Sequence, residues 1–271
     1  MGILIDSDIL RKIDCVLNDS NSQLISLSGK ELQDLACCWC YYSGKIEGNT
    51  YTLVETESLL LDNITSEKRY DDAKMLKNLY NTFISELEYI HKEHNQETID
   101  ERTLLRVHTM ISNELVDFSE SGRYRNRPVR ITGTAYIPPK SQTEIITSVN
   151  DVFCQADLID NPIEKAVFVH CNIARIQPFI DGNKRVSRML EAVVYMNSGL
   201  VPPFSTADKD ILDYRKAIVH FYESNDYKPY FEFVINKQLE RLDLFKESPE
   251  PKFNETIQRT EIHKNHKYLK P

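Results

Sequence analysis

The sequence contains no run of roughly eighteen apolar residues, so nothing in it predicts a membrane-spanning helix. Residues 1–6 carry no basic segment followed by a long apolar core, which argues against a secretory signal. A myristoylation site is also missing, because Asp6 stands where Ser or Thr is needed. The formal net charge of −8 leaves no basic excess to meet a phosphate backbone, so nucleic acid is not expected as a partner.

The six cysteines follow no zinc or disulfide pattern. Cys37 and Cys40 have C-x-x-C spacing, but no second such pair and no close pair of histidines completes a metal site. The apolar run at 35–40 indicates a buried helix instead, in which a free Cys behaves as a small apolar residue. Scattered thiols in a chain of this size favour a reducing, cytoplasmic location.

Helical periodicity dominates the chain and predicts an all-α fold. Ser28 and Glu31 form a capping box that predicts a helix through about Tyr42. We expect one domain over residues 1–246, followed at 247–271 by a C-terminal extension with little core of its own. Further helices are expected at about 66–94, 99–115, 141–157, 162–176, 183–198, 207–224 and 229–245.

One segment, residues 127–139, breaks the helical pattern. It alternates β-branched side chains around Gly133 and closes with Pro138 and Pro139, which predicts a short β-hairpin. Because a lone hairpin is marginally stable, we expect it to pack on the helical body. Its outer edge could then pair with an extended target segment, although a purely structural hairpin is the alternative.

The string QPFIDGNKRVSR at 177–188 connects two predicted helices. Gly182 allows a tight turn and a close approach to a ligand, and Asn183 is a good N-cap for the following helix. Phe179 is expected to be a buried anchor. The free amides and positive dipole end of the new helix then face the loop and form a ready anion site.

Charged side chains surround that helix start. Lys184, Arg185 and Arg188 lie in its first turns, where the two arginines can face a polyphosphate from one side. Asp181 precedes them, and a lone carboxylate beside phosphates suits Mg²⁺, which keeps several waters. No Walker loop occurs in the sequence, so this string is the candidate phosphate site.

The string resembles the signature of the Fic family, H-P-F-x-[D/E]-G-N-[G/K]-R-x-x-R, in every place except the first. The resemblance covers residues 40–240 and implies a helical Fic core at about 66–240. Most members of that family transfer AMP from ATP, with Mg²⁺, to a Ser, Thr or Tyr hydroxyl of a protein. By this resemblance the chain is a protein adenylyltransferase whose target carries such a hydroxyl. The chain itself is one candidate target, and it could act as an oligomer.

The resemblance also implies a role for each residue of the site. Asp181 would hold Mg²⁺, and Arg188 would hold the γ-phosphate. The hairpin resembles the flap that positions the target in the family. Residues implied for the α- and β-phosphates are Gly182, Asn183 and Arg185, and those implied for the flap are Ile131, Thr132, Gly133 and Thr134.

A second motif, at Ser43, Glu47 and Gly48, resembles the family's inhibitory sequence [S/T]-x-x-x-E-[G/N]. Its position implies the class in which an inhibitory helix, here about 28–49, precedes the core. The glutamate would pair with Arg188. An arginine that is held by a carboxylate cannot also clamp the γ-phosphate, so the pair would restrain ATP binding.

Gln177 stands where the family has the histidine that acts as general base. An amide has no useful basicity, and losing a general base typically costs about 10²–10⁴-fold in rate. His170 is expected to pack in the core rather than replace the base. Three interpretations of Gln177 remain open. The chain is a nucleotide-binding module with weak or no transfer, or it carries a substitution in an otherwise active enzyme, or it is a hydrolase in which Glu47 activates water to remove AMP from a modified protein.

Overall fold

The computed structural model describes residues 7–92 and 96–246, which are mostly helical. The all-α prediction is confirmed, because the only β pairing in the described residues is an isolated bridge between Gln23 and Leu200. The α-helices are α1 (Ser7–Asn18), α2 (Gly29–Ile46), α3 (Leu53–Leu61), α4 (Tyr70–Leu87), α5 (Glu101–Ser112), α6 (Gln142–Ala156), α7 (Pro162–Ile176), α8 (Asn183–Asn197), α9 (Asp208–Ser224) and α10 (Lys228–Lys246).

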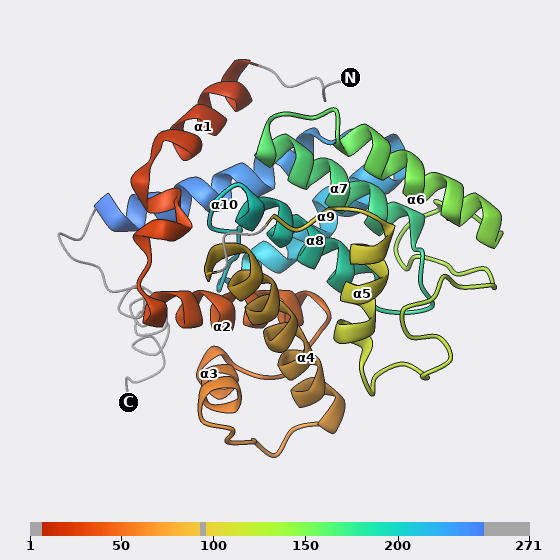
Figure 1. The fold of residues 1–271 in the computed structure, drawn as a ribbon, viewed down its shortest axis with the longest axis horizontal. Coiled ribbons are helices and arrows are strands. Elements are labelled where there is room, and N and C mark those ends of the chain that lie inside the picture. Colours follow the sequence, from red (N-terminus) through yellow and green to blue (C-terminus); the bar gives the residue numbers. More distant parts are fainter. Residues whose placement is uncertain (1–6, 93–95, 247–271) are drawn as a thin grey trace, which may run out of the picture.

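Helix α8 is the centre of the molecule (Figure 1). All its residues from Arg185 to Met196 are buried, which is typical of a helix surrounded by others. Helices α7 and α5 pack directly against it, and α6, α9 and α10 pack against α7. The start of α8, where the phosphate site is predicted, therefore stands on a rigid, fully packed element.

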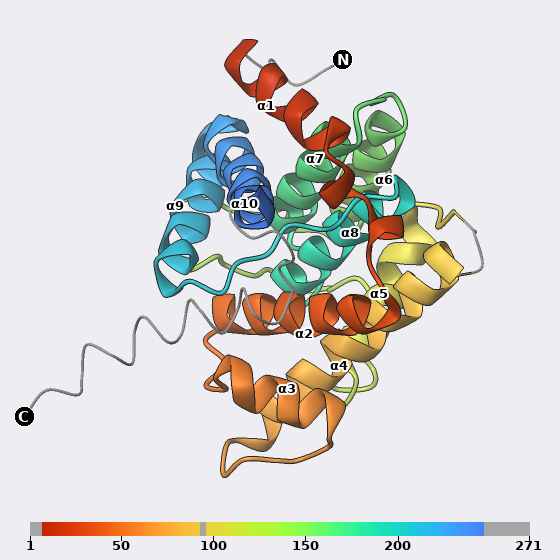
Figure 2. The same cartoon turned by 90° about the vertical axis from the view of Figure 1, so that its left-hand side faces the viewer.

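Helix α2 lies between two parts of the fold (Figure 2). Helices α3 and α4 pack on one side of it, and α9 contacts it on the other. The capping box of Ser28 and Glu31 begins α2 as predicted. Cys37, Cys38 and Cys40 are buried within it, as expected for core cysteines. The end of α2 thereby reaches the side of the molecule that carries the start of α8.

Helices α1 and α3 were not predicted, although the sequence contains signals for both. Ile9, Ile13 and Val16 give α1 a buried stripe at helical spacing. Thr52 and Glu55 form a capping box that begins α3. The helix expected at 66–94 begins at Tyr70 and continues from Glu88 to Lys92 as a π-helical turn. Residues 93–94 of that prediction and the C-terminal extension lie outside the described residues.

The predicted β-hairpin at 127–139 is wrong. The segment turns at Thr132 and Gly133, but its two arms form no strands. Three prolines, at 128, 138 and 139, remove N–H donors from both arms, so a regular ladder cannot form. We keep the name flap for residues 127–139.

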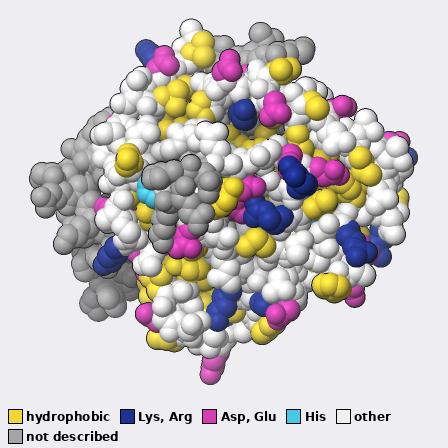
Figure 3. Space-filling model, viewed as in Figure 1, with side chains coloured by type: hydrophobic (Ala, Val, Ile, Leu, Met, Phe, Trp, Pro, Cys, Tyr) yellow, Lys and Arg dark blue, Asp and Glu magenta, His cyan; other side chains and the backbone are white. Residues whose placement is uncertain are grey.

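No helix among the described residues is long and apolar enough to cross a membrane. The surface in Figure 3 intersperses basic, acidic and hydrophobic side chains, so this face carries no continuous basic patch.

Candidate functional site

Two residues with a left-handed backbone conformation define the loop from α7 to α8. Gln177 ends α7 with φ 52° and ψ 60°, and Gly182 precedes α8 with φ 79°. A side chain at the second position would strain the backbone, so glycine is required there. Between these two residues the chain reverses and presents the start of α8.

Asn183 is not the N-cap, contrary to the prediction. Gly182 holds that position, and Asn183 is the first helical residue. The Asn183 amide instead closes the loop on itself: its Oδ1 accepts from the Phe179 N–H at 2.8 Å and its Nδ2 donates to Phe179 O at 2.9 Å. Because no side chain caps α8, its first amides remain open to a ligand.

Phe179 anchors the loop, as predicted, and stacks on a histidine that the sequence did not single out. The ring of His108 lies parallel to Phe179, with centroids 3.7 Å apart. His108 Nδ1 accepts from the Gly122 N–H at 2.8 Å, which leaves Nε2 to donate to Asp181 O at 3.2 Å. Burial lowers the pKa of His108 to about 4, so the ring is neutral near pH 7.

Arg125 is a second support that the sequence did not reveal. It is fully buried, and its guanidinium donates to Gln177 O at 2.6 Å, to Arg127 O at 2.9 Å and to Pro139 O at 2.6 Å. Its backbone N–H donates to Pro178 O. One side chain thus joins both arms of the flap to the loop, in place of the missing β ladder. Its partners are backbone carbonyls, which leave no pattern of residue types in the sequence, so this role could not be predicted.

The first turn of α8 brings Asp181 and Arg185 together. Arg185 Nη2 donates to Asp181 Oδ2 at 2.8 Å, while Arg185 Nε and Nη1 are buried without a hydrogen-bond partner among the described residues. A buried guanidinium with unused donors is costly unless a ligand completes it. The Asp181 side chain is 63% exposed and stands at the mouth of the site.

Arg188, one turn deeper, is almost completely buried and fully engaged. Its Nη2 lies 2.6 Å from Glu47 Oε1 and 3.1 Å from Ser43 O. Its Nε donates to Ser43 Oγ at 2.9 Å, and its Nη1 donates to Tyr214 OH at 3.2 Å. The ion pair expected between Glu47 and Arg188 is therefore present.

Glu47 is held in place by the way α2 ends. It is the C-cap residue, and Gly48 follows it with φ 84°, a conformation that favours glycine. Arg215 donates to Ile46 O at 2.8 Å and fastens the helix end to α9. This local structure points the Glu47 carboxylate across to α8.

The charges around Glu47 stabilise its ionised form. Burial alone would raise the pKa of Glu47, but Arg188, Arg185 and Lys184 outweigh it and lower that pKa below its usual value. For Lys184, burial together with Arg188 and Arg215 outweighs the attraction of Glu47 and lowers the pKa. The start of α8 is therefore a cluster of cationic side chains into which Glu47 inserts its carboxylate.

The flap is fastened by side chains rather than by a sheet. Arg175 lies 4.1 Å from the centroid of the Tyr136 ring, which also stacks on Tyr222. Ile131 is buried, and Thr134 Oγ1 donates to Glu223 Oε1 at 2.9 Å. Thr132 and Gly133, at the turn, are exposed. Ala135 and Ile137 in the second arm are exposed as well, so the turn and part of this arm are open to a partner.

None of the hydrogen bonds described for Gln177 joins it to a histidine or a carboxylate. The Gln177 amide Nε2 donates to Ala174 O at 2.5 Å. His170 is fully buried and packs in the core, as expected, with Nε2 3.2 Å from Tyr214 OH and Nδ1 3.0 Å from Glu191 Oε2. Both ring nitrogens of His108 are already engaged.

The site fits ATP and Mg²⁺. Open helix amides, unused Arg185 donors and clustered cations suit a polyphosphate. The described residues contain no group of three or more His, Cys, Asp or Glu that could hold a metal unaided. A single exposed carboxylate, Asp181, matches Mg²⁺, which takes its other ligands from phosphate oxygens and water.

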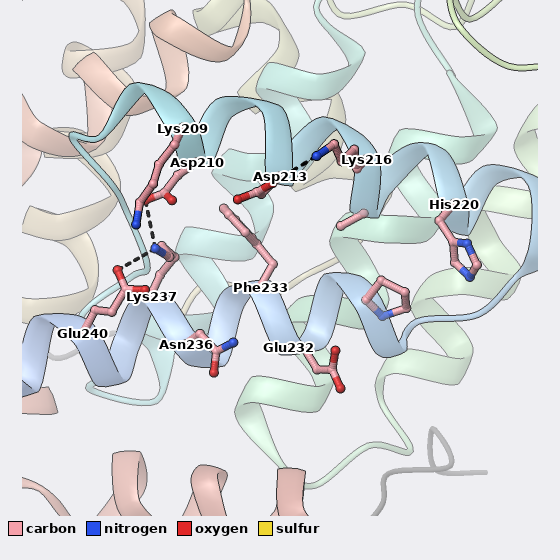
Figure 4. A pocket seen from close by; sticks show the side chains of 12 residues that line it. Lys209, Asp210, Asp213, Lys216, His220, Glu232, Phe233, Asn236, Lys237 and Glu240 are labelled. Atoms are coloured by element: carbon pink, nitrogen blue, oxygen red, sulfur yellow. Dashed lines mark hydrogen bonds and ion pairs between the residues drawn. The ribbon is translucent and has the colours of Figure 1, made fainter.

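A separate groove of about 510 Å³ lies between α9 and α10 (Figure 4). Lys237 lies within it and is paired with Asp210 at 2.9 Å and with Glu240 at 2.5 Å. None of the residues predicted for the functional site lines this groove.

The loop lies within a segment that is similar to known proteins. Residues 98–195 match the family model described as the Fic/DOC family. The chain is 25% identical over 243 residues to protein adenylyltransferase fic-1 of Caenorhabditis elegans, covering 85% of this chain and 45% of that protein. It is 26% identical over 258 residues to protein adenylyltransferase Fic of Nematostella vectensis, covering 89% and 56%. The chain thus spans about half the length of these relatives.

Solved structures share the fold. Fic-1 of C. elegans superposes with a TM-score of 0.66 at 22% identity, covering 85% of this chain and 67% of that chain. A Fic domain containing signaling protein from Bacteroides thetaiotaomicron also gives 0.66, at 21% identity, covering 88% and 94%.

Proposed function

We infer that the chain is a member of the Fic/DOC family, whose model matches residues 98–195, and on that premise we propose that it binds ATP with Mg²⁺ and transfers AMP to a Ser, Thr or Tyr hydroxyl of a protein. The single observation that carries the proposal is the buried Arg188, which stands in the phosphate cradle and is held by Glu47. Arg188 lies one turn after the open amides of α8, and a carboxylate from another helix occupies its donors, as a blocked phosphate site requires.

ATP binds along the start of α8. The open amides after Gly182 and the free donors of Arg185 hold the α- and β-phosphates, and Lys184 adds positive charge. Arg188 holds the γ-phosphate once Glu47 withdraws. Asn183 contributes by fixing the loop through Phe179.

Asp181 would hold Mg²⁺, and the ion would supply positive charge that neutralises the phosphates and the leaving pyrophosphate. In this structure Asp181 is paired with Arg185, so it would have to leave that pair to hold the ion. Arg185 would then be free to bind phosphate.

In the transfer step, the oxygen of the target hydroxyl forms a bond to the α-phosphorus while the bond from that phosphorus to the bridging oxygen breaks. Pyrophosphate leaves, and the hydroxyl proton passes to water, because Gln177 cannot accept it. Phosphoryl transfer depends mainly on positioning and on charge stabilisation, which the site retains. We therefore expect slow transfer rather than none.

The flap positions the target. Its exposed turn at Thr132 and Gly133 offers backbone groups that an extended segment can pair with. The chain itself is one target, in the same molecule or in an oligomer. The free cysteines support a reducing compartment such as the cytoplasm.

The test is incubation of Glu47→Gly and Glu47→Gly/Gln177→His with ATP labelled on the α-phosphate. We expect label on the chain or on lysate proteins, weak in the single variant and strong in the double variant. No label in either variant would overturn the transfer reaction.

A second function, nucleotide binding without transfer, is favoured by one observation. The Gln177 Nε2 amide donates to Ala174 O, and this hydrogen bond keeps the amide from contacting a substrate. Calorimetric binding of ATP with no label transferred in either variant would support this second function.

A further inference from the structure

A chain of buried polar groups leads inward from Arg188. Arg188 Nη1 donates to Tyr214 OH at 3.2 Å, and that hydroxyl lies 3.2 Å from His170 Nε2. His170 Nδ1 lies 3.0 Å from Glu191 Oε2, although not in line for a full hydrogen bond. Tyr230 OH donates to the same carboxylate oxygen at 2.9 Å. The transfer mechanism uses none of the groups behind Arg188.

Donor and acceptor rules constrain the directions of these contacts. A guanidinium can only donate, so the Tyr214 oxygen must accept from Arg188. With the ring proton of His170 on Nδ1, beside Glu191, the Tyr214 hydroxyl donates its proton to His170 Nε2. Glu191 and His170 thereby keep Tyr214 in the orientation that accepts from Arg188.

Aromatic side chains exclude water from this chain. The Tyr230 ring stacks on His170 with centroids 4.6 Å apart. Tyr42 and Phe233 both pack edge-on against Tyr214. Phe233 lies on α10, among the charged side chains of the α9–α10 groove (Figure 4). A hydrogen bond between buried partners holds its geometry better than one that competes with solvent.

The contacts of Arg188 come from two sources. Glu47 and Ser43 belong to α2 and its cap, whereas Tyr214 belongs to α9. If α2 withdraws to release the γ-phosphate site, Tyr214 is the partner that remains. Without this partner the Arg188 side chain would lose its fixed orientation, and ATP would bind more weakly.

We propose that Tyr214 is a positioning residue that keeps Arg188 aimed at the γ-phosphate site after α2 releases it, and that His170 and Glu191 orient Tyr214 for this task. The inference rests on the proposed function, because it assumes that Arg188 meets the γ-phosphate. It assigns a part in nucleotide recognition to residues outside the loop.

The test measures the affinities of ATP and ADP by calorimetry in the Glu47→Gly background. Tyr214→Phe removes one hydrogen bond to a charged group, so ATP should bind about tenfold more weakly. ADP, which lacks the γ-phosphate, should bind as before. A merely structural role would instead weaken ATP and ADP together, and that result would overturn the proposal.

Tyr222→Phe is the matched control. Tyr222 is another buried tyrosine of α9, and its hydroxyl has no hydrogen-bond partner among the described residues. Loss of that hydroxyl should leave both affinities unchanged. Equal loss of ATP affinity in Tyr222→Phe and Tyr214→Phe would contradict a specific role for the hydroxyl of Tyr214.

Glu191→Gln alters the same hydrogen-bond chain at its other end, through His170. It is the alternative variant if Tyr214→Phe does not fold. It should reduce ATP affinity less than Tyr214→Phe and again spare ADP; unchanged ATP affinity in a folded Glu191→Gln protein would overturn the part assigned to Glu191. Failure of Glu47→Gly itself to bind either nucleotide would overturn the proposed function and this inference together. Normal ATP binding by Glu47→Gly/Tyr214→Phe would overturn the inference alone.

Discussion

Arg188 Nη2 donates a 2.6 Å hydrogen bond to Glu47 Oε1 across 141 positions of sequence. The arginine side chain is 2% exposed and the glutamate side chain 21%, so the pair sits at the buried end of the site. The arrangement makes one residue serve two purposes, because Glu47 both stabilises the fold and blocks the arginine that would bind phosphate.

The first prediction concerns stability. Glu47→Ala removes a hydrogen bond between charged groups from a buried guanidinium, and we expect the free energy of unfolding to fall by about 2 kcal/mol at pH 7. The pKa of Glu47 is lowered in the folded protein, so this contribution is present above the unfolded value near 4.5 and is lost as pH falls through the folded pKa. Urea unfolding of both proteins at pH 7 and at acid pH measures it. The same difference at both pH values would contradict the ion pair as its source.

The second prediction concerns the missing base. In the Glu47→Gly background, Gln177→His should raise the rate of AMP transfer by about 10²–10⁴-fold. The rate should rise with pH through the ordinary histidine pKa of about 6.5, because only the neutral ring accepts a proton. Histidine tolerates the left-handed backbone at this position. Gln177→Asn, which keeps an amide, is the control and should show neither change.

The third prediction concerns Mg²⁺. Asp181→Asn should bring the ratio of ATP affinities with and without Mg²⁺ to about one, since the protein then offers no carboxylate to the ion. Calorimetry in the Glu47→Gly background measures this ratio. Asp213→Asn removes an exposed carboxylate on α9 that pairs with Lys216, and it should leave the ratio unchanged. A Mg²⁺ effect that survives in Asp181→Asn would exclude this residue as the ligand.

The fourth prediction concerns His108. Its pKa falls from 6.5 to about 4 on folding, so the unfolded chain takes up a proton first as the pH decreases. Between pH 6.5 and pH 4 the free energy of unfolding should therefore drop by about 3 kcal/mol from this residue. His108→Gln should lack this component in a series of urea unfolding curves across that range. An identical pH dependence in both proteins would mean that His108 is not held neutral.

The sequence predicted the elements whose signals are local. Helix α7 begins at Pro162 after its Asn161 cap and ends before Gln177, as the periodicity and the proline indicated. The ion pair between Glu47 and Arg188 was accessible only through the family resemblance, since nothing local relates residues so far apart.

The hairpin prediction failed for a local reason, because alternating side chains indicate strands but Pro128, Pro138 and Pro139 remove N–H donors that a ladder needs. The other unpredicted features depend on tertiary structure. Arg125 and His108 bind backbone atoms of distant segments, so residue type alone carries no trace of their role. The hydrogen bond between Arg188 and Tyr214 joins α8 to α9 and could not be predicted either.

The most direct test of the central claim is a double-mutant cycle on ATP binding with Glu47→Gly, Arg188→Ala and the combined variant. Calorimetry with Mg²⁺ should show that Glu47→Gly binds ATP about tenfold or more tightly than the unmodified chain. Arg188→Ala should cancel that gain in the combined variant. Independent and additive effects of the two substitutions would contradict the account, because Glu47 would then not act through Arg188.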